Sequence, residues 1–158
     1  MREHIMKNLI LANFLIAVFA SNLLANPLIV KSNSPGYVHA DYSRSEVCSL
    51  FIDRVEIKRS FGRTEGSSFT VTREIPISLD SDLINILTKA NTENLQRDEN
   101  YMCDGPSTSI YANFNEQQVT LFSSGGCGNP RLERIGSFSS MLIDLIDTYC
   151  PKTYDFNR

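Results

Sequence analysis

Two short stretches of the chain alternate apolar and polar side chains. Residues 55–58 read Val-Glu-Ile-Lys, and residues 69–77 keep the same two-residue period with one polar interruption. This period is typical of a strand with one buried face and one solvated face. The polar, glycine-containing residues 61–66 between them are typical of a hairpin loop. We therefore expect a hairpin, with Pro76 at an edge or near a strand end because proline cannot donate to a ladder.

A second hairpin is predicted further along the chain. Residues 110–114 alternate in the same way, and Val119 and Leu121 resume the alternation after Asn115 and Glu116. A tight turn centred on these two polar residues sets the register of the two strands.

Two other segments have apolar residues at the helical spacing of three to four positions. The first predicts a helix over residues 81–96, with Asp80 and Ser81 as good N-cap residues. The second predicts a helix that begins near Ser137 and ends before Pro151. The apolar residues that set this spacing are Leu83, Ile86, Leu87, Ala90, Phe138, Leu142, Leu145, Ile146 and Tyr149. The predicted order, β-β-α-β-β-α, favours an α+β domain: two β-hairpins form an antiparallel sheet, and two helices pack on one face.

The N-terminus is typical of a removable secretion signal. Residues 1–25 have a short basic start and then an apolar run, residues 9–20, that is too short to span a bilayer. We expect a signal peptide over residues 1–25, with no stable membrane span after its cleavage. The rest of the chain then divides into a polar N-terminal arm, a single α+β domain and a C-terminal tail, over residues 26–45, 46–151 and 152–158.

All four cysteines lie beyond the predicted signal. An even cysteine count in an exported domain favours two disulfides and a periplasmic or secreted location. The register of the second hairpin places Cys103 almost opposite Cys127, within reach of a disulfide. Cys48 then pairs with Cys150. Other pairings of the four cysteines remain open at this point.

The formal net charge is −3, and removal of residues 1–25 makes it one unit more negative because they contain two basic residues and one acidic residue. Mild acidity disfavours nucleic acid and anionic membranes as partners. Beyond residue 25 the chain has one histidine, His39, and its cysteines are assigned to disulfides. A nucleophilic triad or a zinc site is therefore difficult to assemble. No Walker loop or dinucleotide fingerprint is present, so we expect neither a metal nor a cofactor.

Paired carboxylates are the remaining route to an enzyme. Asp144 with Asp147, and Asp80 with Asp82, have spacings that an acid–base pair could use. The same spacings are typical of a solvated helix face and of a capping turn, and this is the interpretation that we favour.

The most unusual surface segment is residues 123–131, which contain three glycines around Cys127. Glycine permits positive φ angles and close approach of another molecule. If Cys103 is bonded to Cys127, this segment faces residues 103–106, and together they form a braced surface that we call the rim. The rim residues expected to contact a partner are Asp104, Gly125, Gly126, Asn129 and Arg131. The alternative is that the glycines only allow the chain to leave its strand and reach the last helix.

Tyr111 and Phe122 are two further candidate binding residues. The predicted register makes them near cross-strand neighbours on the face opposite the core, where an exposed aromatic pair would form a contact patch. Equally, the two rings would pack under the N-terminal arm.

These observations favour a small, exported, non-enzymatic binding protein whose partner is another protein, such as an inhibitor or immunity protein for a secreted or invading enzyme. The chemistry of the residues leaves two alternatives open. One is an envelope-acting enzyme that uses a carboxylate pair. The other is a structural or assembly component of the envelope that docks through its sheet.

Overall fold

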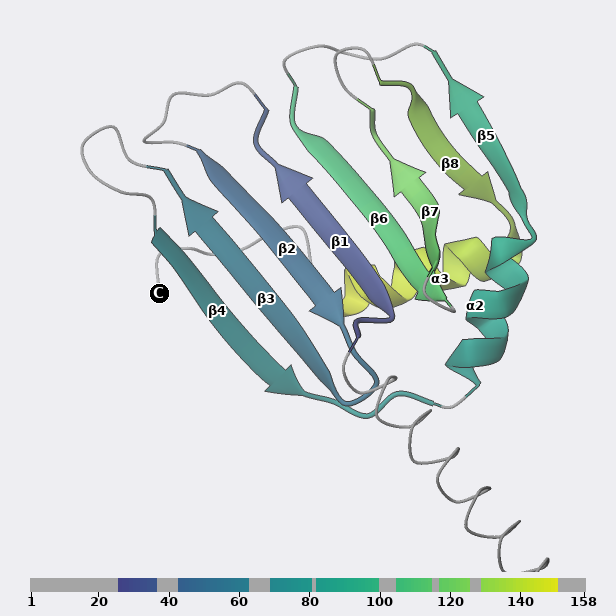
Figure 1. Ribbon diagram of the computed structural model, residues 1–158, viewed down its shortest axis with the longest axis horizontal. Helices are drawn as coiled ribbons and strands as arrows, with labels where there is room; N and C mark the ends of the chain where they lie inside the picture. The colour runs from purple at the N-terminus through teal and green to yellow at the C-terminus, as the bar shows by residue number, and fades with distance from the viewer. Residues whose placement is uncertain are drawn as a thin grey trace, which may run out of the picture.

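The computed structural model describes residues 26–36, 43–62, 69–80, 82–99, 105–114, 117–125 and 129–150. This part of the chain forms one antiparallel sheet of eight strands, together with two helices (Figure 1). Their bounds are β1 (Ile29–Ser34), β2 (Arg44–Leu50), β3 (Arg54–Phe61), β4 (Phe69–Pro76), α2 (Leu83–Asn91), β5 (Asn94–Asp98), β6 (Ser107–Phe114), β7 (Gln117–Ser123), β8 (Arg131–Ile135) and α3 (Ser137–Tyr149). The order across the sheet is β4-β3-β2-β1-β6-β7-β8-β5. The predicted α+β architecture is confirmed, with more strands than two hairpins supply.

β1 lies in the middle of the sheet, paired with β2 on one side and β6 on the other. The sequence predicts a loose polar arm over residues 26–45, but the whole of β1 and the start of β2 fall within that range. The first three residues of β1 are buried. These residues are buried on both faces of the sheet, so they lack the alternation that marks a half-exposed strand.

α3 crosses one face of the sheet, behind the strands in the view of Figure 1. Lys31 and its cross-strand neighbour Cys48 point toward this helix, so Val30 points to the opposite face, where it is also buried. α2 packs against α3 and approaches the sheet at β6. α3 therefore covers one face of the sheet, whereas α2 lies beside α3, near the ends of the strands.

The apolar positions that the helical periodicity predicts are buried in the core or partly buried against it. Between α3, α2 and the sheet lies one core, whose helical members are Leu83, Leu87, Ala90, Leu142 and Ile146. The first helix is shorter than predicted, because it ends at Asn91 and the chain continues into β5, whose five residues are all exposed. In the described part of the chain, no helix is long and apolar enough to cross a membrane.

The hairpin of β6 and β7 has the predicted register near its turn. Ala112 faces Val119 and Tyr111 faces Thr120. A bulge between Ile110 and Tyr111 then shifts the pairing by one residue, so that Ile110 faces Phe122. The bulge places Phe122 on the same face as Ile110 and therefore on the face opposite to Tyr111, which the sequence could not anticipate.

Cys48 of β2 is bonded to Cys150 at the end of α3, as the sequence predicts. The bond joins residues 102 positions apart in the sequence. Closing a loop of this length stabilises the fold by about 4 kcal/mol through the entropy of the unfolded chain. The disulfide therefore fixes the end of α3 on the sheet beside β1.

Candidate functional site

The rim loop folds back on itself at Gly125. This glycine has a φ of 76°, in the left-handed region that other residues rarely adopt. A β-carbon at this position would lie 2.8 Å from the backbone oxygen of Asn129 and 2.9 Å from the backbone nitrogen of Arg131. Glycine is thus required for the two sides of the loop to approach. The structure brings together three of the predicted rim residues, Gly125, Asn129 and Arg131.

Hydrogen bonds hold the start of this loop against β6. The backbone N–H of Ser124 donates to the carbonyl of Thr108 at 2.9 Å, and the N–H of Thr108 donates to the Ser124 hydroxyl at 2.8 Å. Ser124 therefore keeps a fixed position relative to β6. A surface that is ordered before binding loses less entropy when a partner docks.

Arg131 lies over the ring of Phe122, with its guanidinium carbon 5.4 Å from the ring centroid. Its Nη2 also donates to Oε2 of Glu133 at 2.7 Å, and both side chains are partly exposed. A cation–π contact of this kind contributes about 0.5–1 kcal/mol at an exposed site. Phe122 thus supports Arg131, and the two contacts hold the guanidinium at the surface.

The side chain of Tyr111 lies on the opposite face of the sheet from the contact of Arg131 with Phe122. It faces Val30 of β1 and Thr120 of β7, and all three side chains belong to the sheet face opposite α3. Phe122 instead packs against the core that α3 covers. The predicted aromatic pair of Tyr111 and Phe122 is therefore wrong, because the bulge changes the register between them.

The other predicted rim residues, Asp104 and Gly126, lie outside the described residues. The same is true of Cys103 and Cys127, so their disulfide stays a prediction. His39 lies outside them as well.

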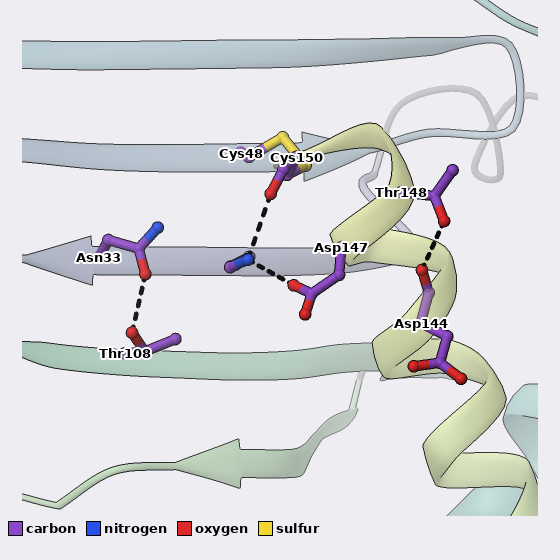
Figure 2. A network of polar contacts seen from close by, with 8 residues as sticks. Asn33, Cys48, Thr108, Asp144, Asp147, Thr148 and Cys150 are labelled. Carbon is purple, nitrogen blue, oxygen red and sulfur yellow. Dashed lines mark hydrogen bonds and ion pairs between the residues drawn. A yellow bond between two sulfur atoms is a disulfide. The ribbon is translucent and has the colours of Figure 1, made fainter. Parts of the chain in front are cut away.

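Lys31 is a buried charged residue that no pattern in the sequence singles out. It is 1% exposed, and its amine forms an ion pair with Asp147 of α3. The same amine donates to the carbonyl of Cys150 at 3.2 Å. Figure 2 shows Asp147 and Cys150 beside the Cys48 disulfide. A cation at the C-terminal end of a helix satisfies a free carbonyl and is stabilised by the helix dipole, so Lys31 anchors α3.

A polar row lies next to Lys31 on the same face of the sheet. Arg59, Glu46, Asn33 and Thr108 stand in register on four neighbouring strands. Arg59 Nε donates to Oε2 of Glu46 at 2.8 Å. The Thr108 hydroxyl donates to Oδ1 of Asn33 at 2.9 Å, a contact that Figure 2 shows. Oε1 of Glu46 is buried and has no hydrogen-bond partner among the described residues. These contacts tie strands together, and we assign the row a structural role.

Glu93 caps the N-terminus of α3 from the segment that follows α2. Its carboxylate accepts hydrogen bonds from the backbone N–H groups of Phe138 at 2.9 Å and Ser139 at 2.8 Å. Burial acts to raise the pKa of the Glu93 carboxyl. Hydrogen bonds from the Ser139 hydroxyl and from these two N–H groups, together with the charge of Arg134, outweigh burial and lower the pKa below its usual range.

The carboxylates considered as acid–base pairs have other contacts. Asp147 is paired with Lys31, while Asp144 lies exposed on α3. Asp80 accepts a hydrogen bond from the backbone N–H of Asp82 at 3.0 Å, and Asp82 is the N-cap of α2. Asp144 thus has the expected surface role, whereas Asp147 pairs with a buried lysine. The side chain of Asp82 makes no capping hydrogen bond to α2.

Among the described residues, no group of three or more His, Cys, Asp or Glu side chains could hold a metal ion. No protein-family model matches the chain, and no match to it is found among curated proteins or solved structures.

Proposed function

We propose that this protein is an exported, non-enzymatic domain that binds another protein, as an inhibitor or immunity protein blocks a secreted or invading enzyme. The surface that carries the proposal is the loop of Gly125, Asn129 and Arg131. The observation that supports the proposal is the close packing of Gly125 against the backbone of Asn129 and Arg131. A backbone held in this way loses less entropy when a partner binds.

The chemistry of the loop favours a partner with an acidic group. Arg131 is 47% exposed in its side chain and its ion pair with Glu133 is a surface one. Surface ion pairs contribute only about 0–1 kcal/mol, so a carboxylate of the partner can replace Glu133 with little loss of stability. Arginine and aromatic residues are also enriched in protein interfaces.

Export is supported by the predicted signal at residues 1–25 and by the Cys48–Cys150 disulfide, which persists outside a reducing cytosol. A second disulfide, Cys103–Cys127, would brace the rim and complete the arrangement. The partner is then a protein of the same oxidising compartment.

The experiment uses the oxidised protein as bait in envelope and secreted extracts, with captured proteins identified by mass spectrometry. Affinity for the captured partner is then measured by titration calorimetry with the N129A/R131A variant. We expect a loss of about tenfold or more, the cost of removing an interface anchor, with an unchanged melting temperature. Equal affinity of this variant and the wild type would contradict the proposed surface.

Arg54→Ala is a matched control. Arg54 also lies over an aromatic ring, 3.9 Å from the centroid of Phe51, and pairs with Asp53. It lies at the start of β3, at the opposite end of the sheet from the loop (Figure 1). The proposal requires that this variant bind like the wild type. If N129A/R131A loses stability as much as affinity, the loop is structural.

A further inference from the structure

β4 (Phe69–Pro76) forms one edge of the described sheet and pairs only with β3. It is eight residues long, and residues 70–74 are all exposed. An exposed edge of this length is a template for pairing with another strand, unless the protein blocks it.

A hydrogen bond at the end of β4 shows which of its N–H groups point away from β3. The N–H of Ile77 donates to the carbonyl of Asp53 at 2.9 Å, toward β3. Because N–H groups alternate between the two sides of a strand, those of Thr70, Thr72 and Glu74 point away from β3. Pro76 falls on this outward side, where its missing N–H removes no bond of the existing ladder. The free edge thus offers three donors in a row.

Two charged residues of this edge, Arg73 and Glu74, form no ion pair within the described part of the chain. Arg73 faces Ile57 on the α3 side of the sheet, and Glu74 faces Glu56 on the other side. Glu56 already pairs with Lys58 at 2.9 Å, whereas Arg73 and Glu74 have no ion pair among the described residues. Like charges directly opposite each other are unfavourable, so the edge lacks a cation beside Glu74 and an anion beside Arg73.

A second copy of β4 cannot supply both charges. In a continuous antiparallel sheet built by a two-fold axis, residues that face each other must point to the same face. Arg73 and Glu74 point to opposite faces, so no register of two β4 strands places one against the other. A strand of different sequence is needed.

We propose that β4 binds an extended segment of a partner protein as an added antiparallel strand. The segment carries a basic residue followed by an acidic residue, which lie opposite Glu74 and Arg73. Apolar residues flank them, opposite Ile75 and Val71, of which Val71 is half exposed. This mode of recognition takes affinity from backbone hydrogen bonds and specificity from alternate side chains. The inference rests on the proposed function in that the partner is a protein, but it uses a surface distinct from the rim.

The test uses a synthetic end-blocked peptide, Val-Lys-Glu-Thr-Val-Thr, and a control peptide with glutamine in place of its Lys and Glu. Amide shifts and hydrogen exchange are recorded on the ¹⁵N-labelled, oxidised protein. We expect the charged peptide to shift the amides of Thr70, Thr72 and Glu74 and to slow their exchange. The control peptide is expected to bind about tenfold more weakly, because it leaves both charges unpaired.

Three variants separate backbone from side-chain effects. Thr72→Pro removes the central outward donor without removing a bond to β3, so it should abolish binding, while Thr72→Ala should retain it. The R73Q/E74Q variant leaves the backbone unchanged and should bind both peptides equally. The inference is overturned if these amides do not respond, if both peptides bind the wild type equally, or if the same amides are protected by concentration-dependent dimerisation.

The rim variant N129A/R131A distinguishes this inference from the proposed function. It should bind the peptide like the wild type. If it loses the captured partner while the β4 variants keep it, strand addition is wrong and the proposed function stands.

Discussion

The carboxylate of Glu93 occupies the space that a side chain at position 136 would need. A β-carbon on Gly136 would lie 1.9 Å from Cδ of Glu93 and 2.0 Å from its Oε1. The φ of Gly136 is 170°, an extended angle that any residue adopts, so the requirement for glycine is one of space. Glu93 needs this space to reach the first N–H groups of α3.

Gly136→Ala should therefore destabilise the protein by displacing Glu93. We expect a loss of about 2 kcal/mol in the free energy of unfolding, similar to the loss of a strong helix cap. Glu93→Ala should cost a similar amount, because it removes the same hydrogen bonds. Both are measured by urea denaturation at neutral pH.

The double variant tests whether the two positions act as one unit. If Gly136→Ala acts only by expelling Glu93, the double variant E93A/G136A should be no less stable than either single variant. Additive losses would show that the added methyl group disturbs something other than the cap.

The pKa of Glu93 predicts how stability depends on pH. The carboxyl has a lower pKa in the folded protein than its unfolded value of about 4.3. The unfolded chain therefore binds a proton more readily, and the stabilisation by Glu93 is complete above the unfolded pKa. It is lost as the pH falls through the folded pKa. Wild type and Glu93→Gln should thus differ in stability at about pH 6 and converge in acid.

Denaturation curves from about pH 6 to about pH 3 check this prediction. Glu74→Gln is a suitable control, since Glu74 is exposed and has no ion pair among the described residues. A gap between wild type and Glu93→Gln that stays constant over this range would contradict the assigned role of the carboxylate.

The helices were predictable because their apolar residues repeat with the helical period, and α3 (Ser137–Tyr149) follows the predicted helix closely. β5 and β8 were not predicted, since β5 is wholly exposed and its pairing with β8 depends on backbone hydrogen bonds. β1 was missed because its burial on both faces removes the alternation on which strand prediction depends.

The residues of the candidate site were likewise predictable only in part. Gly125 could be predicted because glycines near a cysteine mark a close approach of backbones, and its packing against Asn129 and Arg131 follows from local sequence. Lys31 could not, because its partner Asp147 lies 116 positions away. Phe122 was misplaced because a single bulge changes the register of a hairpin without a sequence signal.

The ion pair of Lys31 and Asp147 predicts an asymmetry between its two partners. Asp147→Asn leaves the amine of Lys31 buried at 1% exposure without an anion, and should cost about 3–5 kcal/mol. Lys31→Met leaves Asp147 on the helix surface, where it is 34% exposed and can be hydrated, so its cost should be smaller, about 1–3 kcal/mol.

The double variant K31M/D147N should be more stable than D147N alone, because it removes the uncompensated charge. Asp144→Asn is the matched control on the same helix. Asp144 is exposed, and the change there should stay within about 0.5 kcal/mol of the wild type. If D147N and D144N cost the same, the Lys31 amine does not depend on Asp147.

The Cys48–Cys150 disulfide should resist reduction in the folded protein. Both cysteines are 0% exposed, so a thiol reductant can reach the sulfur atoms only after local or global opening. We expect the rate of reduction of this bond in native buffer to fall far below the rate in urea. The C48A/C150A variant should lose about 4 kcal/mol of stability, because the unfolded chain regains the freedom of a long loop.

Differential alkylation with mass spectrometry measures the rate for this bond alone. Its rate should increase in a variant that loosens the end of α3 without altering the bond, and Asp147→Asn is that variant, because Lys31 also holds the carbonyl of Cys150. Reduction of the wild type at equal rates in native buffer and in urea would show that α3 leaves the sheet freely, and would remove Lys31 and the disulfide as its anchors.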